Sequence, residues 1–206
     1  MRNLLKFVLV ISLMFVFSNM QAQIKFGPKV GINLSTMTLS SSGISLDPTT
    51  LIGFHAGVVS EIPLIAGLSL QPGILYSSKG SKYSFMSEEG TISPGYVEVP
   101  VNVAYGIGSD ALKFSIFAGP YVAYGLTGKY KSGGESEDIV FGTGEDDDMN
   151  PLDYGVNFGV GVNLKALVIS AQYGLGLANL SPDTSGDTEI KNTVIGISLA
   201  YLFGGK

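Results

Sequence analysis

Residues 154–164 read YGVNFGVGVNL, and this stretch decides the fold. Every second residue is large and apolar, and the residues between them are glycine or asparagine. The large set is Tyr154, Val156, Phe158, Val160, Val162 and Leu164. Successive side chains of a β-strand point to opposite faces. The alternation therefore predicts a strand with one bulky apolar face and one face of small side chains.

The same period of two recurs along the chain. Three further stretches show it clearly, at 24–35, 97–105 and 195–203. In the last of these Ile195, Ile197, Leu199, Tyr201 and Phe203 oppose Gly196, Ser198 and Ala200. Less regular versions of this alternation lie at 51–62, 68–79, 112–128 and 167–179. The sequence thus predicts eight strands.

The composition of the two faces indicates the environment. The small face holds mainly glycine, alanine, serine and asparagine, which suits the narrow inside of an eight-stranded barrel. The large face would then meet lipid, with tyrosines at the strand ends in an interfacial girdle. A soluble lipocalin-type barrel would reverse the two faces. The predicted class is all-β: an eight-stranded antiparallel up-and-down transmembrane β-barrel.

The connections give an independent test of this prediction. Three are short, at 63–67, 108–111 and 165–166. Four are long and polar, at 37–50, 80–92, 129–151 and 180–190. Short and long connections alternate strictly, as they do where turns are periplasmic and loops are external. The long connections are therefore expected to be external loops.

Composition excludes several other classes. Hydrophobic residues make up 45% of the 206 residues and charged residues 14%, and there is no cysteine. Past residue 23 no apolar run approaches the roughly 18 residues that a spanning helix needs. Disulfides and thiolate metal sites are excluded, and a net charge of −5 argues against a nucleic-acid partner.

The first 22 residues read as a signal peptide. Arg2 and Lys6 give a positive start, and residues 7–17 are apolar. Cleavage after Ala22 would leave residues 23–206 as the barrel domain, exported to the outer membrane of a Gram-negative bacterium. The expected partners are outer-membrane lipid, lipopolysaccharide and the barrel-insertion machinery. Tyr201 and Phe203 of the last strand are the residues we expect that machinery to read.

The mature chain resembles the PorT-like family of small outer-membrane barrels. The resemblance is carried by FGPKVGINLS near the start, YVEVPVNVAYGI in the centre and VGVNLKALVISAQYGLGLANL with GISLAYLF near the end. It implies the fold and the outer-membrane location. It implies little about activity, because few family members are known beyond being outer-membrane barrels.

His55 is the only histidine, and the strand alternation places it inside the barrel. One interpretation makes it the base of an enzyme that hydrolyses lipid A or phospholipid, or transfers an acyl group, but the sequence shows neither a nucleophile nor an orienting group beside it. The favoured interpretation is a hydrogen-bonded residue of the lumen. We therefore expect no catalytic residues, no cofactor and no metal site.

Five charged residues also map to the inner face: Lys25, Lys29, Glu61, Glu98 and Lys113. Charges in so narrow a lumen are costly unless they are paired. They are therefore expected to form a polar network that plugs the barrel. A narrow pore or a carrier for small molecules is the alternative.

The connection at 129–151 is acidic. Its carboxylates are Glu135, Glu137, Asp138, Glu145, Asp146, Asp147 and Asp148. They could bind calcium or bridge to lipopolysaccharide through divalent ions, although the spacing is not that of an EF-hand. The favoured interpretation is a solvated loop. The sequence as a whole indicates a structural or interaction barrel, with a protein partner at the external loops, rather than an enzyme.

Overall fold

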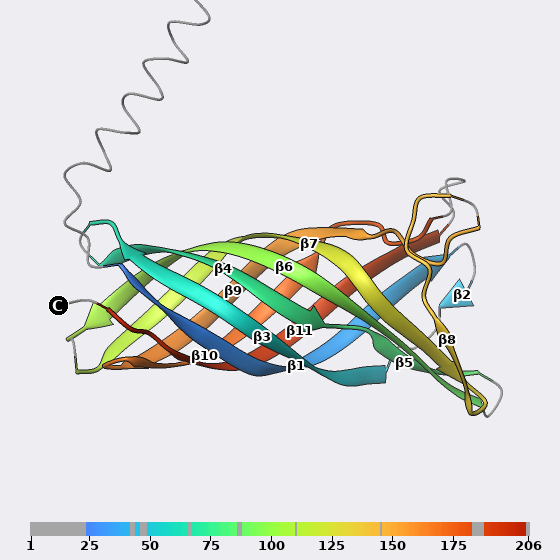
Figure 1. Cartoon of the computed structure of the whole chain (residues 1–206), viewed down its shortest axis with the longest axis horizontal. Coiled ribbons are helices and arrows are strands. Elements are labelled where there is room, and N and C mark those ends of the chain that lie inside the picture. Colours follow the sequence, from blue (N-terminus) through green and yellow to red (C-terminus); the bar gives the residue numbers. More distant parts are fainter. Residues whose placement is uncertain are drawn as a thin grey trace, which may run out of the picture.

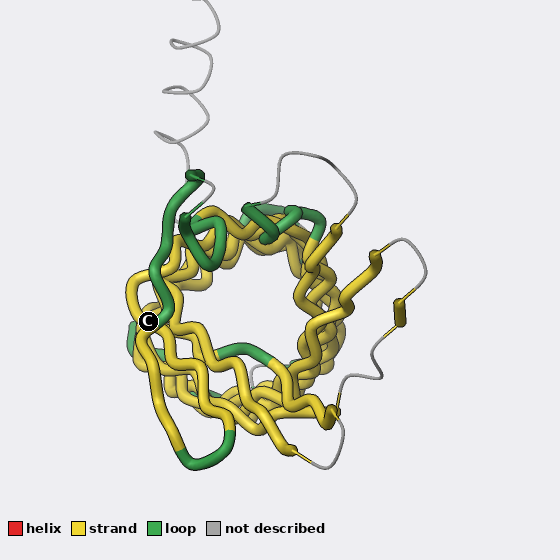
Figure 2. Tube along the Cα trace, turned by 90° about the vertical axis from the view of Figure 1, so that its right-hand side faces the viewer, coloured by secondary structure: helices red, strands yellow, loops and turns green. Residues whose placement is uncertain are grey.

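The structure is a computed structural model that describes residues 24–41, 44–45, 49–65, 67–85, 88–109, 111–144, 146–182 and 188–204. The predicted signal peptide lies outside the described residues. The described chain forms one elongated barrel, seen from the side in Figure 1 and down its axis in Figure 2. No helix in this part of the chain is long and apolar enough to cross a membrane.

Eight long strands make the wall. They are β1 (Lys25–Ser41), β3 (Thr49–Pro63), β4 (Leu68–Ser78), β6 (Glu88–Gly108), β7 (Lys113–Ser132), β9 (Leu152–Leu164), β10 (Leu167–Gly176) and β11 (Thr188–Tyr201). Each pairs antiparallel with the next one along the chain, and β1 pairs with β11. That last pairing closes the ring, so the predicted eight-stranded up-and-down barrel is confirmed.

The barrel has two unlike ends. The chain reverses within a few residues between β3 and β4, between β6 and β7, and between β9 and β10. These reversals lie together at one end, called here the turn end, where β11 also ends (Figure 1). At the tightest of them Lys165 has a φ of 57°, the left-handed conformation that a two-residue hairpin turn requires. The opposite end, where the long connections lie, is called the loop end.

Three of the four long connections are shorter than predicted, and the fourth is displaced along the chain. Three short strands lie there: β2 (Ile44–Ser45), β5 (Ser81–Phe85) and β8 (Glu135–Asp138). The long strands also run into the predicted loops, since β1 ends at Ser41, β6 begins at Glu88, β7 ends at Ser132 and β11 begins at Thr188. The ranges 37–50, 80–92 and 129–151 were therefore predicted too wide. The range 180–190 was predicted three residues too late, since β10 ends at Gly176 and β11 begins at Thr188. These strand ends are rich in serine, threonine and charged residues, and their few apolar residues, such as Met37, Ile92 and Ile190, do not form the alternation that predicts a strand.

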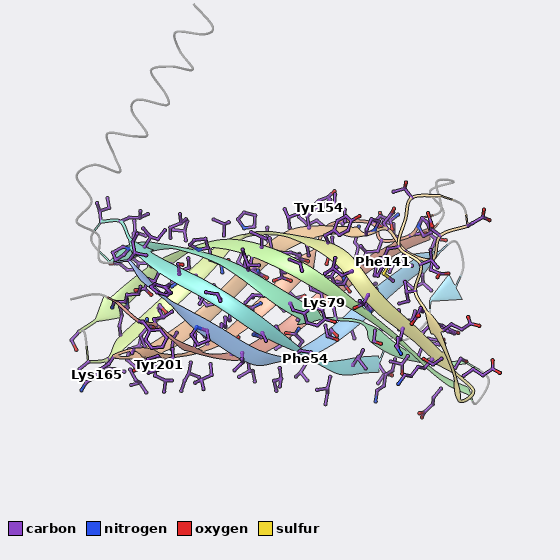
Figure 3. All side chains as sticks on the ribbon, viewed as in Figure 1. Phe54, Lys79, Phe141, Tyr154, Lys165 and Tyr201 are labelled. Atoms are coloured by element: carbon purple, nitrogen blue, oxygen red, sulfur yellow. The ribbon has the colours of Figure 1, made fainter. Side chains whose placement is uncertain are left out.

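Side chains follow the predicted alternation. Ile197 is 48% exposed whereas its neighbour Ser198 is 3% exposed. Figure 3 shows Phe54, Tyr154 and Tyr201 pointing out of the barrel while Lys79 lies within its outline. Large apolar residues thus cover the outside, where a soluble protein would carry charge. The inner face is less uniformly small than expected, because the rings of Phe117, Tyr121 and Tyr96 are buried inside.

Candidate functional site in the polar lumen

The centre of the lumen holds one lysine between two carboxylates. Lys79 Nζ lies 2.8 Å from Glu98 Oε2 and 3.1 Å from Asp153 Oδ2. All three side chains are at most 5% exposed. The ammonium also lies 4.3 Å from the ring centroid of Tyr121, close enough for a cation–π contact. We call Lys79, Glu98 and Asp153 the charge cluster.

The wall strands place the charge cluster at one level of the lumen. Lys79 follows the last residue of β4, Glu98 lies on β6 and Asp153 is the second residue of β9. Asn192 of β11 donates to Asp153 Oδ2 at 3.0 Å, and the Tyr121 hydroxyl donates to Asp153 Oδ1 at 3.3 Å. Side chains from five of the eight wall strands or their ends therefore meet across the barrel. Lys79 pairs with both buried carboxylates, and neutral donors form hydrogen bonds to Asp153.

His55 sits in a second network. Its Nδ1 lies 2.8 Å from Asn33 Oδ1 and its Nε2 lies 2.8 Å from Ser198 Oγ. The Asn33 amide nitrogen donates to the carbonyl of Ser78 at 2.9 Å and to Ser77 Oγ at 3.1 Å. These bonds fix the amide with its oxygen toward the ring, so Nδ1 carries the proton and Nε2 accepts from Ser198.

This network contains the two partners of His55 that the sequence could not supply. The Ser198 hydroxyl donates to one nitrogen of His55, and the Asn33 amide oxygen accepts from the other. A serine nucleophile, its base and an orienting group have this arrangement. Asn33, His55 and Ser198 are each at most 3% exposed, however. The cavity beside His55 has a volume of about 10 Å³. A cavity of that size has space for at most about one water molecule.

The turn end holds a third group of polar side chains. Lys113 Nζ lies 2.9 Å from Glu61 Oε1, and Gln71 donates to Glu61 Oε2 at 3.3 Å. Lys29 Nζ donates to Gln172 Oε1 at 3.3 Å. The five charged residues predicted to face inward thus have different partners. Glu61 and Lys113 form an ion pair, and Glu98 belongs to the charge cluster. Lys29 is buried and belongs to neither group. Lys25 is half-buried opposite Glu61 in the β1–β3 register.

Apolar side chains pack together at the loop end. The buried residues are Met37, Met149, Ala178 and Leu180, with Ile92, Ile139, Phe141 and Ile190 packed against them. Asn150 donates to the carbonyls of Asn179 and Ser181 at 3.2 and 2.7 Å, which ties residues 139–151 to residues 177–182. We call this group the apolar cap; Figure 3 places Phe141 at that end of the barrel.

The apolar cap rests directly on the charge cluster. The ring of Tyr96 lies 6.2 Å from that of Phe141 in an edge-on contact, and its hydroxyl lies 3.5 Å from Met149 Sδ. The same ring lies 5.3 Å from Lys79 Nζ. Tyr96 thus joins the polar lumen to the apolar cap, and it has no measurable exposure.

The acidic residues of the 129–151 connection do not gather in one place. Glu135, Glu137 and Asp138 lie on β8, and Asp138 is opposite Lys129 in the β7–β8 register. Asp147 and Asp148 accept backbone N–H groups from Gly144 and Val140 at 2.7 and 2.8 Å. Glu145 lies outside the described residues. Within the described part of the chain, no three carboxylate, histidine or cysteine side chains are arranged to hold a metal ion.

A closed antiparallel barrel with an apolar outer wall, a polar filled lumen and unlike ends defines a class of protein, the small transmembrane β-barrels of outer membranes. The family described as "Outer membrane protein beta-barrel domain" matches residues 17–181. The chain belongs to this family, and it is an outer-membrane protein. The turn end is accordingly the periplasmic end, and the loop end is external.

Comparison with solved structures finds barrels of similar size. Ail, the attachment invasion locus protein of Yersinia pestis, is 14% identical with a TM-score of 0.41, covering 87% of this chain and 99% of that one. Neisserial surface protein A is 12% identical with a TM-score of 0.44, covering 85% and 97%. The outer membrane enzyme PagL is 12% identical with a TM-score of 0.41, covering 82% and 98%. A search of curated proteins found no match.

Proposed function

We propose that this protein is a closed, non-conducting barrel with a structural or interaction role in the outer membrane. The apolar cap carries the proposal, because it seals the external mouth above a charge cluster whose members are already paired. An ion or solute crossing the lumen would have to displace both. Two lumenal cavities in the described residues, of about 50 and 10 Å³, lie on the periplasmic side of the cap.

Single-channel recording in planar bilayers tests the closed barrel. The purified full-length protein is expected to give no stable conductance step. A variant with Leu180→Ser and Met149→Ser, which removes two apolar residues of the cap, is the matched comparison. A stable conductance step in the wild type, equal to that of this variant, would refute the closed barrel.

The interaction surface that we propose is the sheet projecting from the loop end. The register of β6 and β7 runs from Gly90 opposite Ser132 to Gly108 opposite Lys113, so this hairpin is longer than the wall requires. β5 and β8 flank it (Figure 1), and Tyr83 stacks on Tyr130 with centroids 5.9 Å apart. A rigid sheet held outside the membrane is a suitable platform for a protein partner or for lipopolysaccharide.

We also propose that the chain is a PorT-like barrel within the family. The motifs FGPKVGINLS and YVEVPVNVAYGI support a place among PorT-like barrels, a group in which one branch is linked to protein secretion. A deletion strain complemented with the wild type, or with a chain lacking the β7–β8 tip, separates the roles. Loss of secretion would assign a secretion role, whereas loss of envelope integrity alone would assign a structural one.

A second candidate, an outer-membrane hydrolase, is favoured by the contacts among Ser198, His55 and Asn33. A fluorophosphonate probe tests it directly, because such a probe forms a bond with an activated serine oxygen. Labelling that disappears in both Ser198→Ala and His55→Ala would establish the hydrolase. The burial of all three residues supports the structural role instead, for which no labelling is expected in bilayers.

A further inference from the structure

Lys29 is a buried lysine without a carboxylate partner. It is 9% exposed, and among the described residues it forms no ion pair. Within the part of the chain that the structure describes, its side chain has one hydrogen bond, to Gln172 Oε1 at 3.3 Å. An ammonium group has three donors, so two remain to be satisfied.

The lumenal charges are unevenly distributed around Lys29. The charge cluster gives Lys79 two carboxylates, and Glu61 is held by Lys113 and Gln71. Glu98 is paired with Lys79 at 2.8 Å. The region around Lys29 is therefore locally positive, while the charge cluster above it is locally negative.

A cavity of about 50 Å³ lies beside Lys29 on the periplasmic side. Its polar lining includes Lys29, Glu61, Gln71, Asn102, Ser115 and Ser170, and Glu61 is engaged by Lys113 and Gln71. Asn102 is 6% exposed, and its amide oxygen has no hydrogen-bond partner. Since the O and N of an amide are interchangeable by rotation, Asn102 can turn its NH₂ group into the cavity.

A buried cation is stable when a counterion or several hydrogen bonds replace its lost hydration. The surroundings of Lys29 supply one hydrogen bond, a cavity and nearby amide and hydroxyl donors. We propose that this cavity binds a small monovalent anion, chloride or a short carboxylate such as formate, with Lys29 as its cation and Asn102 as a donor. The lumen would then bind an anion in addition to filling the barrel.

The size of the cavity limits the ligand. One water needs roughly 10–15 Å³ of such volume, so the cavity holds only a few water-sized groups. Chloride and formate fit this space, whereas gluconate, with its six-carbon chain, does not. The apolar cap and the charge cluster close the route from outside, so the anion enters from the periplasmic end and leaves by the same way.

Thermal unfolding of the full-length barrel in detergent tests the site. Melts are recorded in sodium chloride, sodium formate and sodium gluconate at matched ionic strength. A ligand that binds only the folded state lowers the unfolding equilibrium constant by 1 + [L]/Kd, about elevenfold at ten times Kd. Wild type is expected to melt higher in chloride and formate than in gluconate. Lys29→Gln should lose that difference, and Lys191→Gln, at an exposed lysine, should keep it.

The line width of the chloride-35 NMR signal is the second measurement. Wild-type barrel should broaden it, formate should reverse the broadening, and Asn102→Leu, which fills the cavity without changing charge, should abolish it. This arm remains informative should Lys29→Gln fail to fold. Equal melts in all three salts with no broadening would overturn the proposal, as would an anion effect that survives Asn102→Leu.

Discussion

Replacing Lys79 by methionine should destabilise the barrel more than any loss of a surface charge. The substitution leaves Glu98 and Asp153 buried without their cation. Asp153 keeps the bonds from Tyr121 and Asn192, but Glu98 has no other hydrogen-bond partner among the described residues. Removing one member of a buried ion pair costs about 3–5 kcal/mol, because the remaining charge is uncompensated. Glu98 carries most of that cost here.

Urea titration of the barrel in detergent gives the measurement, with the folded fraction read from the faster gel mobility of unheated samples. Lys191→Met is the control, since Lys191 pairs with Glu189 at 2.9 Å in an exposed position. Exposed pairs contribute about 0–1 kcal/mol. Lys79→Met combined with Glu98→Gln should recover much of the loss, because the second change removes the stranded charge. A loss for Lys79→Met no larger than that of the control would refute the reasoning.

Three further predictions follow from other parts of the barrel. Gly31→Ala should cost about 1–3 kcal/mol in the same titration, because the added Cβ meets the Ile197 carbonyl and the His55 ring; a neutral effect would contradict the tight packing of the wall there. Phe203→Ser should lower the yield of inserted barrel in cells without changing the melt of refolded protein, if the insertion machinery reads the last strand. N-terminal sequencing of the outer-membrane form should begin at Gln23, and a start at Met1 would show that the leader is retained.

The sequence predicted the wall because each spanning strand carries its environment in its alternation. In 154–164 and 195–203 the large residues meet lipid and the small ones the lumen, so strand number and face could be read directly. The strand ends outside the membrane carry no such pattern, and β5 and the start of β6 were therefore predicted to be loop. Lys79 fell at the boundary of a predicted loop for the same reason, although it forms the centre of the lumen.

The contacts inside the lumen could not be predicted, because alternation gives the face of a residue but not its height. β4 and β9 are separated in the ring by β6 and β7, so Lys79 reaches Asp153 across the barrel and not along a strand pair. The height of each residue depends on the stagger of all eight registers together. His55, Asn33 and Ser198 lie instead on the neighbouring strands β3, β1 and β11, where both His55 and Ser198 are opposite Gly31. Their contacts depend on these two registers, which the alternation of side chains does not give.

The two ends of the lumen therefore call for different explanations. In the charge cluster Lys79 pairs with both carboxylates, and the apolar cap packs above it through Tyr96, although the amide oxygen of Asn192 beside Asp153 has no partner among the described residues. Lys29 and Asn102 leave a charge and an amide oxygen unsatisfied within the described residues, beside a cavity on the periplasmic side. Residues retained only to fill a barrel would be expected to pair, as Lys113 and Glu61 do. Whatever this lumen binds should accordingly come from the periplasm, while contacts with the outside are made by the projecting sheet.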